Sequence, residues 1–180
     1  MTDPIEPLYT AEQIHDTIAG MAKEIAADYQ GREIRMVGVL KGAFMVISDL
    51  ARALEDVPLS IDFMSVASYG SGTSTSGVVR ILKDLDRDVA GQHVLVVEDV
   101  IDSGLTLNWL LKNLRSRNPA SVEVAALLRK PAAALVDVPV KYVGFDIENT
   151  FVVGYGLDYA ERYRNLPYIG TLRPEAVPGS

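Results

Sequence analysis

The sequence of 180 residues has no cysteine, so it can form neither disulfide bonds nor cysteine-ligated zinc sites. A chain without disulfides suits a reducing compartment, and we expect a cytoplasmic protein. Histidine is almost absent as well, because His15 and His93 are the only two and they stand far apart. This scarcity argues against a histidine-rich metal site and against a Ser-His-Asp catalytic triad.

Excess positive charge and long apolar runs are also missing. The 24 acidic residues outnumber the 17 lysines and arginines, and the formal net charge is −7. Nucleic acids and anionic membranes both require a basic face, so we expect neither as a partner. The first ten residues, MTDPIEPLYT, contain acids and lack the apolar stretch of a signal peptide, and no other segment is long enough to span a membrane.

The sequence does contain enough apolar material for one domain over residues 1–180, with 48% hydrophobic residues. A capping-box pattern starts at Thr10 and apolar residues follow at helical spacing, which predicts a helix from Thr10 to about Ala27. The same spacing predicts helices over 42–54, with Phe44 on the buried face, and over 105–117. Apolar runs predict strands at 34–40, 59–66, 93–98, 122–128 and 141–147.

Strands that alternate with helices are typical of a parallel sheet with helices on both faces, in which ligands bind at the carboxyl ends of the strands. We therefore expect a site near Lys41, Glu98 and Arg129, where predicted strands end. One segment, SYGSGTSTSG at residues 68–77, has nothing to bury. It is either the linker of a hairpin or a mobile lid, and its length favours the lid.

The stretch EDVIDSGLT, from Glu98 to Thr106, combines acids with a turn at the start of a predicted helix. Backbone amides and hydroxyls around Ser103 to Thr106 would form a cradle for a monophosphate, although the Walker pattern is absent. Glu98 and Asp99 would instead accept hydrogen bonds from a vicinal diol or hold hydrated magnesium. Helix capping explains one acid here and not three, so we interpret the stretch as a sugar-phosphate site.

This stretch closely resembles the phosphoribosyl-pyrophosphate signature of type I phosphoribosyltransferases. Over residues 8–172 the chain resembles the hypoxanthine-guanine branch of that family, in five blocks that match in order: VLKGAFMVISDLAR, FMSVASYGSGTSTSG, RILKDLDRDVAGQHVLVVEDVIDSGLTL, LLRKP and FVVGYGLDYAERYRNLPYIGTL. The resemblance implies an α/β fold with a central, mostly parallel sheet flanked by helices. A small hood subdomain would come from the N-terminal segment and the C-terminal part of the chain.

The implied activity transfers a phosphoribosyl group from 5-phospho-α-D-ribose 1-diphosphate to hypoxanthine or guanine, with Mg²⁺ as cofactor. The products would be IMP or GMP and pyrophosphate, as in purine salvage, and the family leads us to expect a homodimer or homotetramer. Two alternatives stay open, a xanthine-preferring transferase and a non-catalytic regulator that binds phosphoribosyl pyrophosphate. Such a regulator needs a basic DNA-binding module, whereas about nine residues precede the first predicted helix and the chain is acidic.

The resemblance also assigns roles at the phosphoribosyl-pyrophosphate end. Glu98 and Asp99 would hold the ribose hydroxyls and a magnesium shell, and Asp158 a second magnesium. The turn at Lys41 would contact pyrophosphate and often contains a non-proline cis peptide in this family. Many relatives have lysine at the position of Leu105, so phosphate affinity could be lower here. The complete expected set is Lys41, Gly42, Glu98, Asp99, Asp102, Ser103, Gly104, Leu105, Thr106 and Arg164.

At the purine end, the resemblance makes Asp102 the general base near N7, with a helix N-cap as its alternative role. Lys130 would donate to O6 of the purine, and Arg129 beside it would be structural or solvated. Phe151 would stack on the base, although an aromatic residue in an apolar run is usually part of the core. The other expected contacts are the Val152 backbone and Asp158 at the base, and Ser68 and Tyr69 in the flexible loop.

Overall fold

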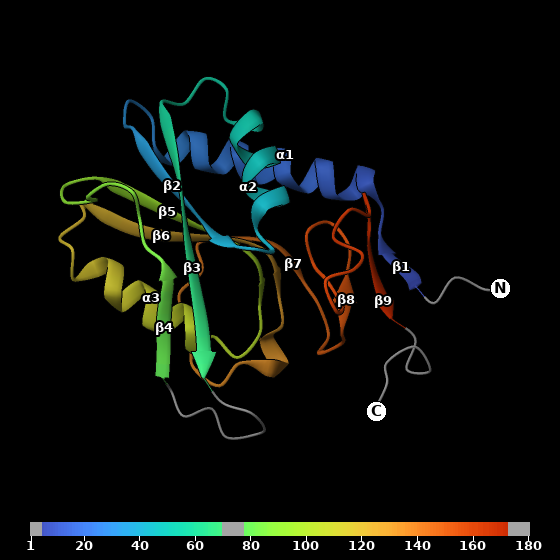
Figure 1. Ribbon diagram of the computed structural model, residues 1–180. Helices are drawn as coiled ribbons and strands as arrows, with labels where there is room; N and C mark the ends of the chain where they lie inside the picture. Colours follow the sequence, from blue (N-terminus) through green and yellow to red (C-terminus); the bar gives the residue numbers. More distant parts are fainter. Residues whose placement is uncertain (1–4, 70–77, 173–180) are drawn as a thin grey trace.

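The computed structural model describes residues 5–69 and 78–172, which form a large sheet with helices on both faces and a small sheet beside it (Figure 1). The large sheet has six strands, in the spatial order β4 (Val78–Lys83), β3 (Leu59–Tyr69), β2 (Ile34–Leu40), β5 (His93–Ile101), β6 (Ser121–Arg129) and β7 (Tyr142–Asp146). All neighbouring strands are parallel except β3 and β4. The predicted fold class is confirmed, and the antiparallel edge strand β4 is an addition to it.

Helices α1 (Ala11–Asp28) and α2 (Phe44–Ala53) cover one face of this sheet, and α3 (Leu105–Arg115) covers the other (Figure 1). Because side chains alternate along a strand, β5 contributes Leu95 and Val97 to the core under α1 and α2, and Val94 and Val96 to the core under α3. The predicted capping box also forms: Gln13 N donates to the Thr10 hydroxyl at 3.2 Å.

Two predicted boundaries in this region were wrong. Helix α2 starts at Phe44, not at residue 42, and Phe44 is 37% exposed because the buried stripe runs through Val46, Ile47 and Leu50 instead. Strand β5 continues past Glu98 to Ile101, since its pairing with β6 continues to Arg129. Glu98 and Asp99 therefore lie inside a strand, whereas Asp102 follows its end.

The small sheet combines both ends of the described chain. It contains β1 (Ile5–Tyr9), β9 (Ile169–Leu172) and β8 (Val152–Val153), in this spatial order and with antiparallel pairing. The ring of Tyr9 stacks on that of Phe145 in β7 with centroids 3.9 Å apart, which ties the small sheet to the edge of the large one. Its position brings residues from far along the chain beside the carboxyl ends of the large sheet (Figure 1).

The segment expected to be a loop from 68 to 77 begins later than predicted. Ser68 and Tyr69 belong to β3, because their backbones pair with Val79 and Val78 of β4. Residues 70–77 lie outside the described part of the chain, so the lid interpretation stays a prediction. Within residues 5–69 and 78–172, no helix is both long and apolar enough to cross a membrane.

Candidate active site

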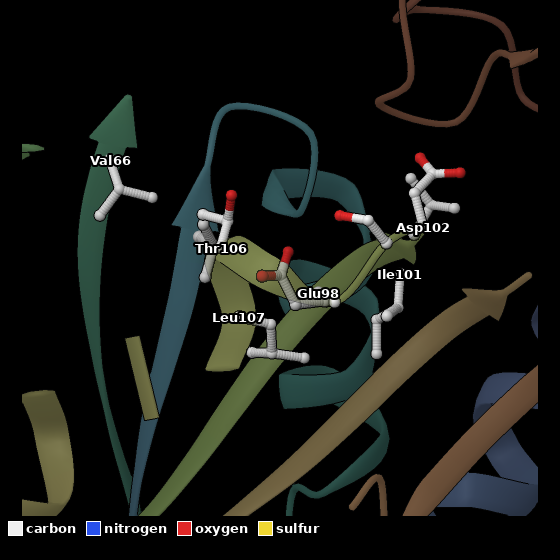
Figure 2. Close-up of a pocket in the computed structure, with 10 residues that line it drawn as sticks. Val66, Glu98, Ile101, Asp102, Thr106 and Leu107 are labelled. Atoms are coloured by element: carbon white, nitrogen blue, oxygen red, sulfur yellow. The ribbon is translucent and has the colours of Figure 1, made fainter. Parts of the chain in front are cut away.

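A cavity of about 290 Å³ opens where β5 passes into α3, at the carboxyl edge of the large sheet (Figure 2). In Figure 2 the Glu98 side chain rises from β5 between the side chains of Thr106 and Asp102. The lining consists of Val39, Val66, Glu98, Val100, Ile101, Asp102, Ser103, Gly104, Thr106 and Leu107. Two acids of the motif, Glu98 and Asp102, and its Ser-Gly-x-Thr turn therefore line one space, whereas Asp99 does not line it.

The turn before α3 depends on Gly104, which is the N-cap of the helix and has φ +78°. A Cβ atom at this position would lie 3.1 Å from the Val136 carbonyl oxygen, so both the backbone conformation and the packing favour glycine. The Ser103 hydroxyl accepts from Leu105 N at 3.3 Å. Since Gly104 occupies the cap, the alternative role of Asp102 as helix cap was wrong. The first turn of α3 presents its amides at the cavity, which is a favourable place for an anion.

Glu98 and Asp99 are half-buried carboxylates at neighbouring positions of β5. Burial and the neighbouring Asp99 raise the pKa of Glu98. Burial raises the pKa of Asp99 to about 6, against the opposing effects of backbone hydrogen bonds and the Arg164 charge. None of the ion pairs within residues 5–69 and 78–172 includes either carboxylate. Half-buried acids that form no ion pair suit a cation or a hydroxyl-bearing ligand.

The turn after β2 lies directly against these acids. A Cβ atom on Gly42 would be 1.6 Å from Asp99 Oδ2, so no other residue fits unless the carboxylate moves. Gly156, with φ +97°, approaches from the other side, because a Cβ there would be 2.2 Å from the Gly42 carbonyl oxygen. The Leu40–Lys41 peptide is cis, as the resemblance implied. Three segments distant in sequence thus meet at one point.

Lys130 and Asp102 form an ion pair, with 2.8 Å between Nζ and Oδ1. Lys130 follows β6 and is buried at 7% exposure, whereas the Asp102 side chain is 53% exposed. Sequence reasoning placed both residues near the purine and did not anticipate their contact. Arg129 has a different environment, since it pairs with Asp146 of β7 at 2.7 Å, which fits the structural one of the two roles expected for it.

The segment after β7 positions two of the residues expected at the purine. Phe151 is 50% exposed and meets Tyr159 edge to face, with ring centroids 5.8 Å apart, so the interpretation of Phe151 as a core residue was wrong. Val152 is buried in β8, and its backbone pairs with Thr171 of β9. The small sheet therefore fixes the backbone beside an exposed aromatic ring.

A cluster of charges closes the side of the site near Lys41. Arg164 donates to the Gly156 carbonyl at 2.7 Å and pairs with Asp158 at 2.9 Å. Lys41 pairs with Glu161 at 3.0 Å, a contact between residues 120 positions apart. Sequence reasoning assigned Arg164 in this segment and missed Glu161, because no local pattern indicates a contact across 120 positions.

The structure does not gather Glu98, Asp99 and Asp158 into one metal cluster. Within the described ranges, no three Asp, Glu, His or Cys side chains converge in a way that could hold a metal ion. Arg164 binds Asp158 directly, and its charge also acts to lower the pKa of Asp99. The arrangement provides a carboxylate pair in β5 and a separate carboxylate near Arg164.

Comparisons with known proteins agree with this geometry. The model of the phosphoribosyl transferase domain family matches residues 5–160. The chain is 60% identical over 173 residues to the hypoxanthine-guanine phosphoribosyltransferase of Mycobacterium tuberculosis, covering 93% of this chain and 85% of that protein. It is 47% identical to the enzyme of the same name from Dictyostelium discoideum, covering 94% and 96%. A crystal structure of a Staphylococcus aureus hypoxanthine phosphoribosyltransferase superposes with a TM-score of 0.91 at 47% identity, covering 94% and 92%.

Proposed function

We propose a role for each end of the cavity from one premise: the chain belongs to the phosphoribosyltransferase family. It is an enzyme of purine salvage that transfers the phosphoribosyl group of 5-phospho-α-D-ribose 1-diphosphate to hypoxanthine or guanine. The products are IMP or GMP and pyrophosphate. Neither a xanthine-preferring transferase nor a non-catalytic regulator is favoured, since the relatives at 47% and 60% identity are named for hypoxanthine and guanine.

One observation supports this assignment most strongly: the start of α3 and the Glu98 carboxylate of β5 line the same cavity. Phosphoribosyl pyrophosphate has a phosphate at one end and ribose hydroxyls beside it. The amides from Ser103 to Thr106 suit the 5′-phosphate, and the carboxylates of Glu98 and Asp99 suit the hydroxyls. Leu105 contributes only its amide here, so the cradle lacks the lysine charge that many relatives have.

The two carboxylates also suit Mg²⁺, because their oxygens are hard ligands and neither forms an ion pair among the described residues. When bound, magnesium would neutralise the diphosphate and make it a better leaving group. Glu98 and Asp99 would hold one ion, and Asp158 a second one once Arg164 turns to the diphosphate. Lys41 and Arg164 would donate to the diphosphate oxygens, with Gly42 leaving room for Asp99.

At the purine end, Asp102 would accept the proton from the base and Lys130 would donate to O6. Their ion pair fixes the two groups 2.8 Å apart, so a base that approaches one also approaches the other. The exposed ring of Phe151 is available for stacking, and the Val152 backbone would border the base. An adenine amino group offers no acceptor to Lys130, whereas the O6 atom of hypoxanthine and guanine does.

Base selectivity tests this assignment. With magnesium present, turnover should be high with hypoxanthine and guanine, and adenine should be rejected by roughly 10⁴-fold, because a buried donor would face a donor. Lys130→Ala should lower kcat/KM for hypoxanthine and narrow the gap to adenine. The neighbouring Arg129→Ala variant is the matched control and should preserve the selectivity, since Arg129 pairs with Asp146. Wild-type protein that uses adenine as well as hypoxanthine would contradict the role of Lys130.

Three further features belong to the same proposal. Excess chelator in the purine assay should abolish turnover, because several carboxylates would otherwise face a polyphosphate without a cation between them.

We also propose a homodimer or homotetramer. Exposed apolar side chains such as Leu82 at 60% and Leu135 at 72% are consistent with this, and light scattering would measure the mass of the assembly.

A cytoplasmic location agrees with the cysteine-free composition.

A further inference from the structure

One carboxylate, Glu161, touches two of the cations assigned to the diphosphate. Its Oε2 lies 3.0 Å from Lys41 Nζ, and its Oε1 lies 3.3 Å from Arg164 Nη2. Each oxygen therefore receives one cationic donor, which is how two oxygens of a phosphate group would be bound. The hydrogen bond from Lys41 holds the pKa of Glu161 below its usual value, consistent with a negative charge at this position.

The backbone around Glu161 is held in an unusual conformation. Ala160, Glu161 and Tyr163 have φ values of +50°, +62° and +76°, a region that non-glycine residues rarely adopt. The Glu161 amide donates to Asp158 Oδ2 at 2.8 Å, which fixes the turn. The local structure therefore directs the carboxylate back toward Lys41 and does not leave it at a free loop tip.

The contacts themselves are easily exchanged. The Lys41 and Glu161 side chains are 66% and 67% exposed, so their pair has little net strength in water. Arg164 is more buried, at 21% exposure, and its Nε atom has no hydrogen-bond partner within the described residues. A diphosphate has more charge and more acceptor oxygens than one carboxylate, so it can displace Glu161 from both cations.

We propose that Glu161 is an internal competitor of the diphosphate, which occupies Lys41 and Arg164 in the empty site and returns to them as pyrophosphate leaves. This inference depends on the function proposed for those two cations. Its consequence is a lower affinity for diphosphate ligands and faster release of pyrophosphate. The apparent dissociation constant equals the intrinsic one divided by the fraction of protein in which Glu161 has left the cations.

Isothermal titration with inorganic pyrophosphate and magnesium measures this competition. Glu161→Gln should bind pyrophosphate roughly 2- to 10-fold more tightly, the range expected for displacing exposed ion pairs. Glu161→Asp is the decisive second variant, because it preserves the charge but shortens the side chain. If Glu161 competes through direct contact with Lys41 and Arg164, Glu161→Asp should also bind pyrophosphate more tightly than wild type. If only the net charge near the site affects binding, Glu161→Asp should have the wild-type affinity, which would contradict competition by contact. Glu24→Gln, which removes an exposed charge from α1, should leave the affinity unchanged.

A double-mutant cycle with Lys41→Ala identifies the partner. The gain from Glu161→Gln should shrink in the Lys41→Ala background, because one of the two competed cations is then absent. In steady-state kinetics, the KM for phosphoribosyl pyrophosphate should fall while kcat stays equal or decreases. Unchanged or weaker binding by Glu161→Gln would overturn this inference, since Glu161 would then only hold Lys41 in place. Wild-type protein that fails to bind magnesium pyrophosphate would instead contradict the function proposed for Lys41 and Arg164, and this inference with it.

Discussion

Asp62 of β3 and Glu98 of β5 are two carboxylates that point to the same face of the large sheet, the face covered by α3. Asp62 precedes Met64 by two positions and Glu98 follows Val96 by two, and both apolar residues belong to the core under α3. Asp62 is 4% exposed and accepts from the amides of Phe63 and Asp86 at 2.8 and 3.0 Å.

The two acids differ in their electrostatic partners. Arg35 Nη1 lies 3.9 Å and Lys83 Nζ 3.7 Å from the Asp62 carboxylate, so two cations balance its charge. Glu98 has no ion pair within the described residues, and burial beside Asp99 raises its pKa. Cationic partners offset the desolvation cost of a buried acid, whereas an acid without them reduces stability and suits a ligand. This difference distinguishes the structural part of the sheet from the functional edge.

The largest effect on activity should come from Asp102, the acid on the functional edge that we assign to proton transfer. Asp102→Asn should lower kcat by about 10²- to 10⁴-fold while phosphoribosyl-pyrophosphate binding persists, because the amide cannot accept the proton. Forward kinetics over a range of pH, with separate titration of phosphoribosyl pyrophosphate, would measure both. Near-normal turnover across the pH range would remove Asp102 from the mechanism.

The largest effect on stability should come from the other part of the sheet. Asp62→Ala should lower the free energy of unfolding by about 3–5 kcal/mol in urea denaturation, because Arg35 and Lys83 would lose their shared partner. Asp62→Asn should cost less, since its amide oxygen can still accept from backbone N–H groups. Glu98→Gln is the matched variant and should abolish activity without destabilising the fold. The comparison fails if Glu98→Gln destabilises the protein as much as Asp62→Asn does.

A smaller effect should appear in the pH dependence of stability. The pKa of Asp99 is about 6 in the folded protein and near 3.8 without the fold, so between these values the folded state binds more protons. The free energy of unfolding should therefore fall as pH rises from about 4 to 6 and then level off. Asp99→Asn should match wild type near pH 4 and exceed it near pH 7 by on the order of 1–3 kcal/mol. Urea denaturation without magnesium at both pH values measures this, and equal stability of both proteins at pH 7 would argue against the raised pKa.

Local patterns determined much of the fold. The capping box at Thr10, the helical spacing in α1 and the apolar runs of five parallel strands all depend on neighbours within four residues, so the sequence alone reveals them. The Ser-Gly-x-Thr turn is also partly local, because Gly104 can adopt the left-handed conformation without the steric cost of a Cβ atom. The antiparallel strand β4 escaped prediction because an edge strand of six residues has little pattern of its own.

Only the tertiary structure decided which of these elements meet. The contact of Gly42 with Asp99, the pairing of Lys130 with Asp102 and the bridge from Lys41 to Glu161 each join distant segments. Such contacts depend on strand register and on the docking of the small sheet, neither of which leaves a periodic signal in the chain. Electrostatic compensation is a property of the same kind: the sequence contains Asp62 and Glu98 as similar acids after apolar residues, and only the packed sheet provides cations to one of them and not to the other.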